Sequence, residues 1–81
     1  TWSKIEKIDD FEYQVIDELA RFFHARQSSL SMTKCEQMAM IITKTTSELL
    51  WLSLSSDQAL RQDLVAETKL LTWSYLQQYL D

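Results

Sequence analysis

The chain of 81 residues contains no glycine and no proline. At average usage, a chain of this length would hold roughly six glycines and four prolines. Without glycine, the tight β-hairpin turns that depend on Asn-Gly sequences are not available. Without proline, no helix is interrupted by a residue that lacks a backbone N–H. These absences favour an all-α protein whose helix ends are capped by serine, threonine and aspartate.

Cysteine and positive charge are also scarce. The one cysteine, Cys35, excludes a disulfide within the chain and is typical of a reducing compartment, so we expect a cytoplasmic protein. Eight basic residues against twelve acidic ones give a net charge of -4. Binding to a phosphate backbone needs clustered lysine and arginine, so we expect no direct nucleic-acid contact from this segment. No apolar run approaches the roughly 20 residues of a membrane span, so we expect no membrane partner.

The chain is rich in apolar residues, at 46% of its length, with three each of Trp, Tyr and Phe. Its 81 residues make one domain at most, near the lower size at which a single core is adequate. We therefore expect one all-helical domain over residues 1–81. Because the unit is small and begins with threonine, it is as compatible with a piece of a longer protein as with a complete one.

Three stretches carry apolar residues at the three- and four-residue spacing of an amphipathic helix. In the first, Asp9 and Glu12 have the spacing of a capping box, and in the third Ser56 or Asp57 can cap the first turn. A serine-containing break follows each of the first two. The predicted helices comprise residues 9–26, 33–54 and 57–80.

The first and second predicted helices differ in the breadth of their apolar surface. The first has a single stripe of Phe11, Val15, Leu19 and Phe22, flanked by Ile16 and Phe23, which we expect to be its buried face. The segment Met32–Leu54 carries apolar residues on more than one face, so it needs to be covered from at least two sides. This predicts a three-helix antiparallel bundle that completes a larger helical bundle by homodimerisation.

Candidate catalytic and metal-binding residues are few. His24 and Cys35 could act as base and nucleophile or as two metal ligands, but a metal site needs three or four ligands, and no C-x-x-C or H-E-x-x-H motif is present. A histidine at a helix end and a small buried cysteine are the simpler interpretation. We therefore predict no metal, no cofactor and no enzymatic activity.

Aromatic and methionine side chains suggest a different kind of site. Between the first two helices they could line a pocket for a small apolar ligand. Ordinary packing of the same side chains in the core is the alternative. The predicted pocket residues are Phe22, Phe23, Met38, Met40 and Trp51. Outside the core stripe of the third helix, Leu70 and Trp73 could form an interface with another chain.

The second half of the chain resembles the carboxyl-terminal part of TetR-family transcriptional regulators. In that family an apolar penultimate helix, a short Asp- or Ser-containing turn and a final helix with a Leu-x-x-Glu-x-x-Leu-Leu-x-x-x-Tyr-Leu pattern follow one another. Here these parts correspond to Ala39–Leu54, to Ser55-Ser56-Asp57, and to Leu64, Glu67, Leu70, Leu71, Tyr75 and Leu76. The resemblance covers residues 9–80 and is most specific from Ala39 onward.

This resemblance implies a homodimer in which the last two helices of each chain form a four-helix interface, with a small-effector pocket on their other side. The interface predicted in this way comprises Ala39, Thr46, Leu49, Leu50, Leu70, Leu71, Trp73 and Tyr75. The family's helix-turn-helix unit has no counterpart in this chain. Members of the family often carry glycine in the middle of the penultimate helix, where this sequence has Thr45-Thr46-Ser47.

Three functions are therefore considered. The first is the dimerisation and small-molecule-sensing part of a TetR-like transcriptional regulator. The second is a free-standing helical module that acts in protein–protein interaction or oligomerisation without a ligand. The third is a small all-helical enzyme.

Overall fold

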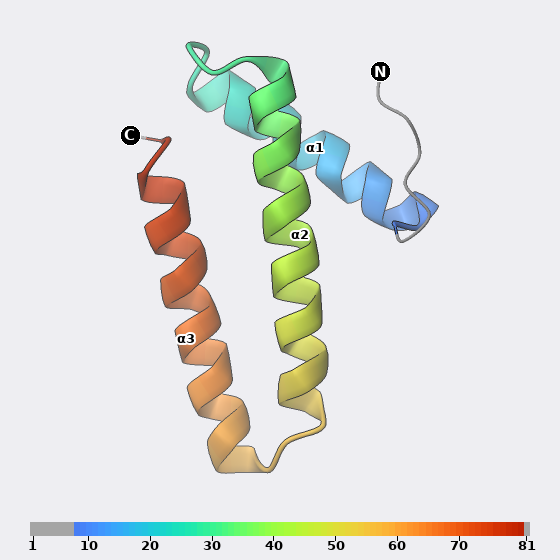
Figure 1. The fold of residues 1–81 in the computed structure, drawn as a ribbon, viewed down its shortest axis with the longest axis vertical. Coiled ribbons are helices and arrows are strands. Elements are labelled where there is room, and N and C mark those ends of the chain that lie inside the picture. The colour runs from blue at the N-terminus through green and yellow to red at the C-terminus, as the bar shows by residue number, and fades with distance from the viewer. Residues whose placement is uncertain (1–7, 81) are drawn as a thin grey trace.

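The computed structural model describes residues 8–80 (Figure 1). Its three helices are α1 (Asp10–Arg26), α2 (Met32–Leu54) and α3 (Gln58–Gln77). Residues 8–80 contain no strand, so the all-α prediction is confirmed. Compared with the predicted bounds, α2 begins one residue earlier and α3 ends three residues earlier. The chain beyond α3 forms a turn in which the Leu80 N–H donates to the Leu76 carbonyl at 2.8 Å.

Each helix begins at a side-chain cap. Asp9 Oδ1 accepts from the Glu12 N–H at 2.8 Å, and Glu12 Oε1 accepts from the Asp9 N–H at 3.3 Å, so the predicted capping box is present. Ser31 caps α2 through a 3.0 Å bond, and Asp57 caps α3 through a 2.9 Å bond, each from the backbone N–H three residues later. Such caps satisfy backbone donors that have no partner within the helix.

The three helices form a flat molecule with extents of 40 × 32 × 13 Å. Figure 1 shows α2 and α3 side by side in antiparallel orientation, while α1 crosses the amino-terminal half of α2 at a steep angle. α2 packs against both other helices, as its broad apolar surface predicted. α1 lies against the amino-terminal half of α2, on one side of the α2–α3 pair, and no helix of residues 8–80 lies on the opposite side.

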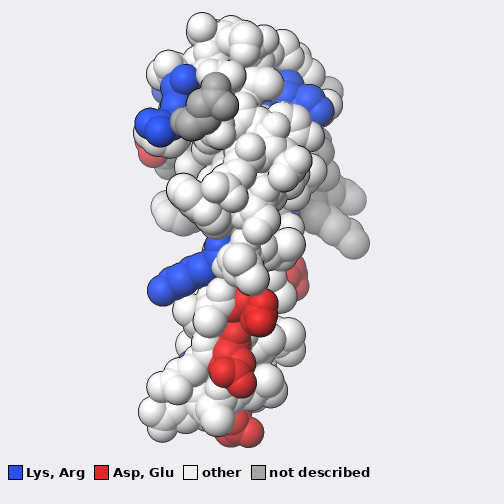
Figure 2. Space-filling model, turned by 90° about the vertical axis from the view of Figure 1, so that its left-hand side faces the viewer, with Lys and Arg blue, Asp and Glu red and all other residues white. Residues whose placement is uncertain are grey.

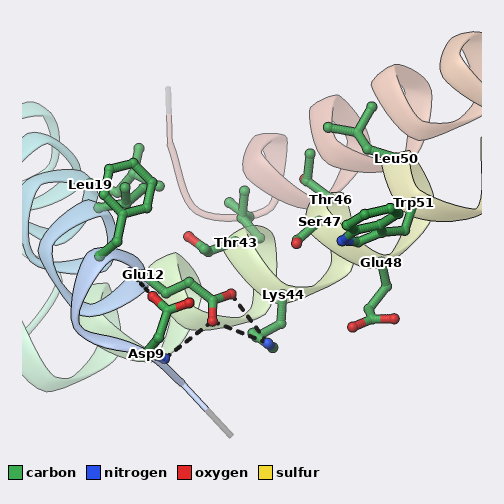
Figure 3. A pocket seen from close by; sticks show the side chains of 13 residues that line it. Asp9, Glu12, Leu19, Thr43, Lys44, Thr46, Ser47, Glu48, Leu50 and Trp51 are labelled. Carbon is green, nitrogen blue, oxygen red and sulfur yellow. Dashed lines mark hydrogen bonds and ion pairs between the residues drawn. The ribbon is translucent and has the colours of Figure 1, made fainter. Parts of the chain in front are cut away.

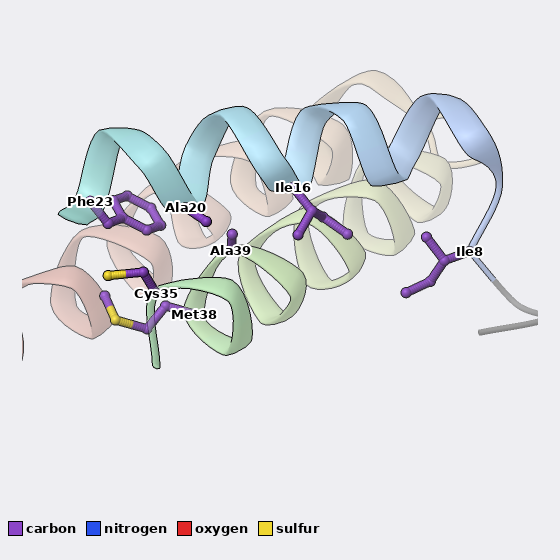
Figure 4. Packing of buried hydrophobic residues seen from close by; sticks show 7 residues of the cluster. All are labelled: Ile8, Ile16, Ala20, Phe23, Cys35, Met38 and Ala39. Atoms are coloured by element: carbon purple, nitrogen blue, oxygen red, sulfur yellow. The ribbon is translucent and has the colours of Figure 1, made fainter. Parts of the chain in front are cut away.

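The hydrophobic core lies at the crossing of α1 and α2 (Figure 4). Its buried members are Ile8, Ile16, Ala20, Phe23, Cys35, Met38 and Ala39. Ala20 and Ala39 point towards each other between the two helices, and such small side chains allow helices to approach closely. From the end of α3, Tyr75 and Leu76 pack against this core and are only partly buried. The core is therefore concentrated at one end of the molecule.

The residues of α1 that are buried differ from those of the predicted apolar stripe. Ile16, Ala20 and Phe23 are buried, whereas Phe11 and Phe22 are 73% and 59% exposed. The prediction that these two phenylalanines lie in the buried face was therefore wrong. Because α1 crosses α2 steeply, the contact is limited to the turns near the crossing point, and residues at both ends of the apolar stripe lie outside it.

The connection between α2 and α3 is held by Arg61. Its Nε–H donates to the Ser53 carbonyl at 3.1 Å. Its Nη2 donates to the Ser56 carbonyl at 3.2 Å and to the Leu54 carbonyl at 3.4 Å. Ser53 and Leu54 are the last residues of α2, where backbone acceptors lack helical partners, and Ser56 follows in the loop. A cation there also interacts favourably with the helix dipole. We refer to these three bonds as the Arg61 clamp.

Candidate functional site

An open groove lies between α1 and the carboxyl-terminal half of α2 (Figure 3). Its volume is about 610 Å³, within the range of roughly 300–1,000 Å³ usual for small-molecule sites. The residues that line it are Asp9, Phe11, Glu12, Val15, Leu19, Ile42, Thr43, Lys44, Thr46, Ser47, Glu48, Leu50 and Trp51. We refer to this cavity as the α1–α2 groove.

At one end of the groove, polar side chains of α1 and α2 are joined by an ion pair. Lys44 Nζ lies 3.2 Å from Glu12 Oε2, with the Lys44 and Glu12 side chains 34% and 17% exposed. The same Glu12 carboxylate belongs to the capping box with Asp9 (Figure 3). Glu12 therefore connects the first turn of α1 to the middle of α2. An ion pair of this exposure contributes on the order of 1 kcal/mol, and its geometry also orients the two helices.

The remainder of the groove is largely apolar, with aromatic rings at its opening. Val15 and Leu19 come from α1 and Leu50 from α2. Phe11 on α1 and Trp51 on α2 also line the groove, and they are the two most exposed of the large apolar side chains, at 73% and 70%. Each ring therefore has a free face for a ligand or another chain.

Two smaller cavities adjoin α3. One of about 340 Å³ lies between the carboxyl-terminal ends of α1 and α3 and is lined by Phe22, Phe23, Arg26, Trp73, Leu76, Gln77 and Leu80. The other, of about 130 Å³, lies between α2 and α3 and is lined by Ile41, Ile42, Thr45, Leu71, Thr72 and Tyr75. The larger of the two adjoins the hydrophobic core at Phe23. The smaller is a shallow depression between α2 and α3, which we call the α2–α3 seam.

The structure does not bring the five predicted pocket residues together. Phe22 and Phe23 line the cavity at the ends of α1 and α3, while Trp51 lines the α1–α2 groove. Met38 is completely buried in the core, and Met40 packs against the core from a partly buried position. Met38 and Trp51 are thirteen residues apart, which is about 220° around a helix, so they face different sides of α2.

The eight predicted interface residues are divided in the same way. Ala39 is completely buried against α1, so in this conformation it has no surface to offer to a partner. Thr46 and Leu50 line the α1–α2 groove, Leu71 and Tyr75 line the shallow α2–α3 seam, and Trp73 lines the cavity beside α1. Leu49 is half-buried and Leu70 is exposed.

A different set of apolar residues shares one face of the α2–α3 pair. Ile41 and Leu71 line the same shallow seam and are each 51% exposed. Leu52 follows Ile41 by eleven residues and Leu60 precedes Leu71 by eleven, about three turns, so each falls on the same side of its helix. Leu52 and Leu60 are 53% and 48% exposed. We call the surface formed by these four residues the hairpin face.

The outer edge of α3 is more polar than the hairpin face. Asp63 and Glu67 are one turn apart and exposed. Figure 2, which views the molecule from its α3 side, shows acidic side chains in a row down the lower half and separate groups of basic side chains at both sides of the upper half. Charged side chains keep an edge solvated, so the flat faces of the molecule are the better candidates for burial against a partner.

His24 and Cys35 do not form a catalytic or metal-binding pair. His24 Nδ1 lies 3.0 Å from the Leu30 carbonyl, which ties the end of α1 to the following loop. Burial, and secondarily the nearby Glu36 carboxylate, raise the pKa of the Cys35 thiol above its ordinary value of 9.0. A raised pKa keeps the thiol protonated, which makes it a poor nucleophile. No group of three or more potential metal ligands gathers within residues 8–80.

Comparison with known protein families identifies the family of the chain. Residues 1–76 match the family model described as tetracyclin repressor-like, C-terminal domain. The chain belongs to this family. Tetracyclin repressor-like C-terminal domains generally mediate ligand binding and dimerisation in transcriptional regulators, and they are regulator domains, not enzymes. No curated protein and no solved structure matches the chain.

The resemblance to the TetR family over residues 9–80, which is most specific from Ala39 onward, is thus confirmed. Several residues of the groove and of the hairpin face, in contrast, were not predicted. The Glu12–Lys44 pair joins residues 32 positions apart, and nothing in the local sequence marks such a pair. The eleven-residue spacing of Ile41 and Leu52 could have been recognised as one helix face. Within residues 8–80, no helix is sufficiently long and apolar to span a bilayer.

Proposed function

We propose that this chain is the dimerisation and small-molecule-sensing part of a TetR-like transcriptional regulator that acts in the cytoplasm. The observation that supports this best is the position of two apolar surfaces on opposite sides of α2. Ile41 on the hairpin face and Leu50 in the α1–α2 groove are nine residues apart, about 180° around the helix. One surface can therefore be covered by a second copy while the other remains open to a ligand.

The hairpin face is the proposed dimer interface. Ile41, Leu52, Leu60 and Leu71 are each about half exposed, which leaves apolar area on both helices of the α2–α3 pair. Two copies that meet through the same face would bury these residues around a two-fold axis and form a four-helix arrangement. This retains the predicted four-helix interface but replaces most of the residues predicted for it.

The α1–α2 groove is the proposed effector site. α1 contacts α2 mainly at the crossing core and through the Glu12–Lys44 pair, so the groove between them can change width if α1 tilts. A ligand that fits one tilt better than another shifts the population towards it, and only that difference in affinity can produce a signal. In a longer regulator, the movement of α1 would be passed to the segment that precedes it.

The dimer proposal is tested by two neighbouring substitutions. In Leu71→Glu, a carboxylate is placed on the hairpin face beside Ile41, twice in a symmetric dimer. Leu70→Glu is the matched control, because Leu70 lies two residues after the buried Thr68, about 200° around α3 and so away from α2. An unpaired buried carboxylate costs several kcal/mol, so we expect Leu71→Glu to weaken dimerisation by at least about 100-fold.

Sedimentation velocity at micromolar concentration measures the outcome, and circular dichroism verifies that both variants remain helical. We expect the unsubstituted chain and Leu70→Glu to sediment as dimers and Leu71→Glu as a monomer. A helical monomer for the unsubstituted chain would refute the dimer. Loss of the dimer in Leu70→Glu, with Leu71→Glu unaffected, would place the interface on another face.

A further inference from the structure

We propose that the α1–α2 groove binds a lipophilic organic cation: a molecule with an apolar body and one positively charged centre. This deepens the proposed sensing role and rests on it. The groove is apolar along most of its length, carries an excess of negative charge and is lined by an exposed carboxylate, Glu48, one helical turn from an exposed indole, Trp51. These three features together select the class of ligand.

The charge of the lining is the first argument. Three carboxylates, those of Asp9, Glu12 and Glu48, line the groove against one ammonium, that of Lys44. Glu12 and Lys44 form the 3.2 Å ion pair at one end of the groove. The lining therefore keeps a net charge of -2 at neutral pH, from three acids and one base. An anionic ligand would be repelled, while a cation would be attracted.

The position of Glu48 is the second argument. Glu48 is exposed and forms no hydrogen bond or ion pair with another residue of the 8–80 range. Glu48 and Trp51 are three residues apart in α2, so their side chains leave the same side of the helix. Figure 3 shows the Glu48 side chain extending from α2 below the Trp51 ring. A carboxylate and an aromatic ring that line the same groove can both attract an organic cation, the first by Coulomb attraction and the second by cation–π contact.

The apolar body of the ligand is the third argument. Val15 and Leu19 from α1 and Leu50 from α2 line the groove between its polar end and its aromatic opening. Phe11 is 73% exposed and also lines the groove, from α1. An aromatic or branched aliphatic body of drug-like size fits the volume of about 610 Å³. A small hydrophilic cation would leave these side chains in water and gain little.

The probes for a test are tetraphenylphosphonium and tetraphenylborate, which have nearly the same size and shape and opposite charge. Isothermal titration calorimetry of each ion into the 81-residue chain compares their dissociation constants directly. We expect tetraphenylphosphonium to bind at least about tenfold more tightly than tetraphenylborate, and its affinity to fall as salt concentration rises.

Glu48→Gln and Trp51→Leu locate the bound cation. Both side chains are exposed, so neither change removes core packing, and circular dichroism verifies the fold. We expect about a fivefold loss of tetraphenylphosphonium affinity in each variant. Glu67→Gln is the matched control, because it removes the same charge from an exposed position on α3 that does not line the groove. It should change affinity less than about twofold.

The outcomes separate the ligand class from the sensing role. If both ions bind equally and Trp51→Leu weakens both, the groove remains a ligand site and the preference for cations is refuted. If neither ion binds, the cation proposal is refuted, whereas the proposed sensing role of the groove for another class of ligand and the dimer test with Leu71→Glu are unaffected. If Glu67→Gln weakens binding as much as Glu48→Gln does, the attraction is a general charge effect and the assignment to Glu48 fails.

Discussion

Cys35 is an ionisable residue that folding removes from water. It is completely buried between α1 and α2, and this burial, more than the charge of Glu36, raises the pKa of its thiol above 9.0. Burial also raises the pKa of Tyr75, with a smaller effect from Tyr79. In both cases the folded state holds the proton more tightly than the unfolded chain does.

A dependence of stability on pH follows for Cys35. Because the folded pKa is raised, the contribution to stability is fully present below the unfolded pKa of about 9.0 and is lost as pH rises through the folded value. We expect the free energy of unfolding to decrease from neutral pH to about pH 10, and to decrease less in Cys35→Ala, which has no thiol to titrate. Urea denaturation of both proteins under reducing conditions measures the difference. If the free energy of unfolding of both proteins decreased equally with pH, the effect would not come from the Cys35 thiol.

At the scale of the helices, the Arg61 clamp holds the α2–α3 connection together. No glycine terminates α2, so the carbonyls at its end are satisfied by side chains. Ser55 and Ser56 hydroxyls donate to carbonyls of the last turn at distances from 2.8 to 3.1 Å. Arg61 adds three further bonds from the neighbouring helix. The pair of helices that forms the proposed interface is thus connected by a short loop with fixed geometry.

Replacement of Arg61 by alanine should loosen this connection. We expect a loss of about 1 kcal/mol in the free energy of unfolding, because the bonds are charge-assisted but largely exposed. Amide hydrogen exchange of residues 54–57 should also become faster, while exchange in α1 stays unchanged. Gln62→Ala is the control, since Gln62 is an exposed neighbour on the same turn. Equal exchange rates in the loops of both variants would show that the clamp has no structural effect.

At the scale of the whole molecule, the core and the apolar surface are unevenly distributed. Seven hydrophobic residues are buried within residues 8–80, nearly all at the α1–α2 crossing. In the same range, twelve large hydrophobic residues remain exposed. A chain of this size is close to the limit at which one core can stabilise a fold. Most of the exposed apolar residues lie on α2 and α3, and the proposed dimer would bury those of the hairpin face.

This distribution predicts a thermal midpoint that changes with protein concentration. If the hairpin face is covered by a second copy, dimerisation stabilises the folded state by mass action. We expect the midpoint to rise by several degrees between low and high micromolar concentration, and to be independent of concentration in Leu71→Glu. Circular dichroism melts over this range provide the measurement. A constant midpoint for the unsubstituted chain would mean that folding and association are not coupled.

The sequence alone was sufficient for the helices and for the family. Helix starts depend on local chemistry, so Asp9 and Asp57 could be recognised as caps from their own neighbours, and the predicted ends were correct to within three residues. The family pattern from Ala39 onward depends on residue spacing within helices, which is also local. The absence of glycine and proline excluded most alternatives to an all-α fold.

The tertiary structure decided which side of each helix is buried. The crossing of α1 over α2 buries Ala39 and leaves Phe11 in the open groove, although both lie in apolar stripes. It also brings Glu12 to Lys44 across 32 positions of sequence. Apolar spacing shows that a helix has an apolar face, but the angle at which helices cross determines how much of that face is covered. That angle depends on side-chain packing between distant segments, so only the folded chain could assign the groove and the hairpin face.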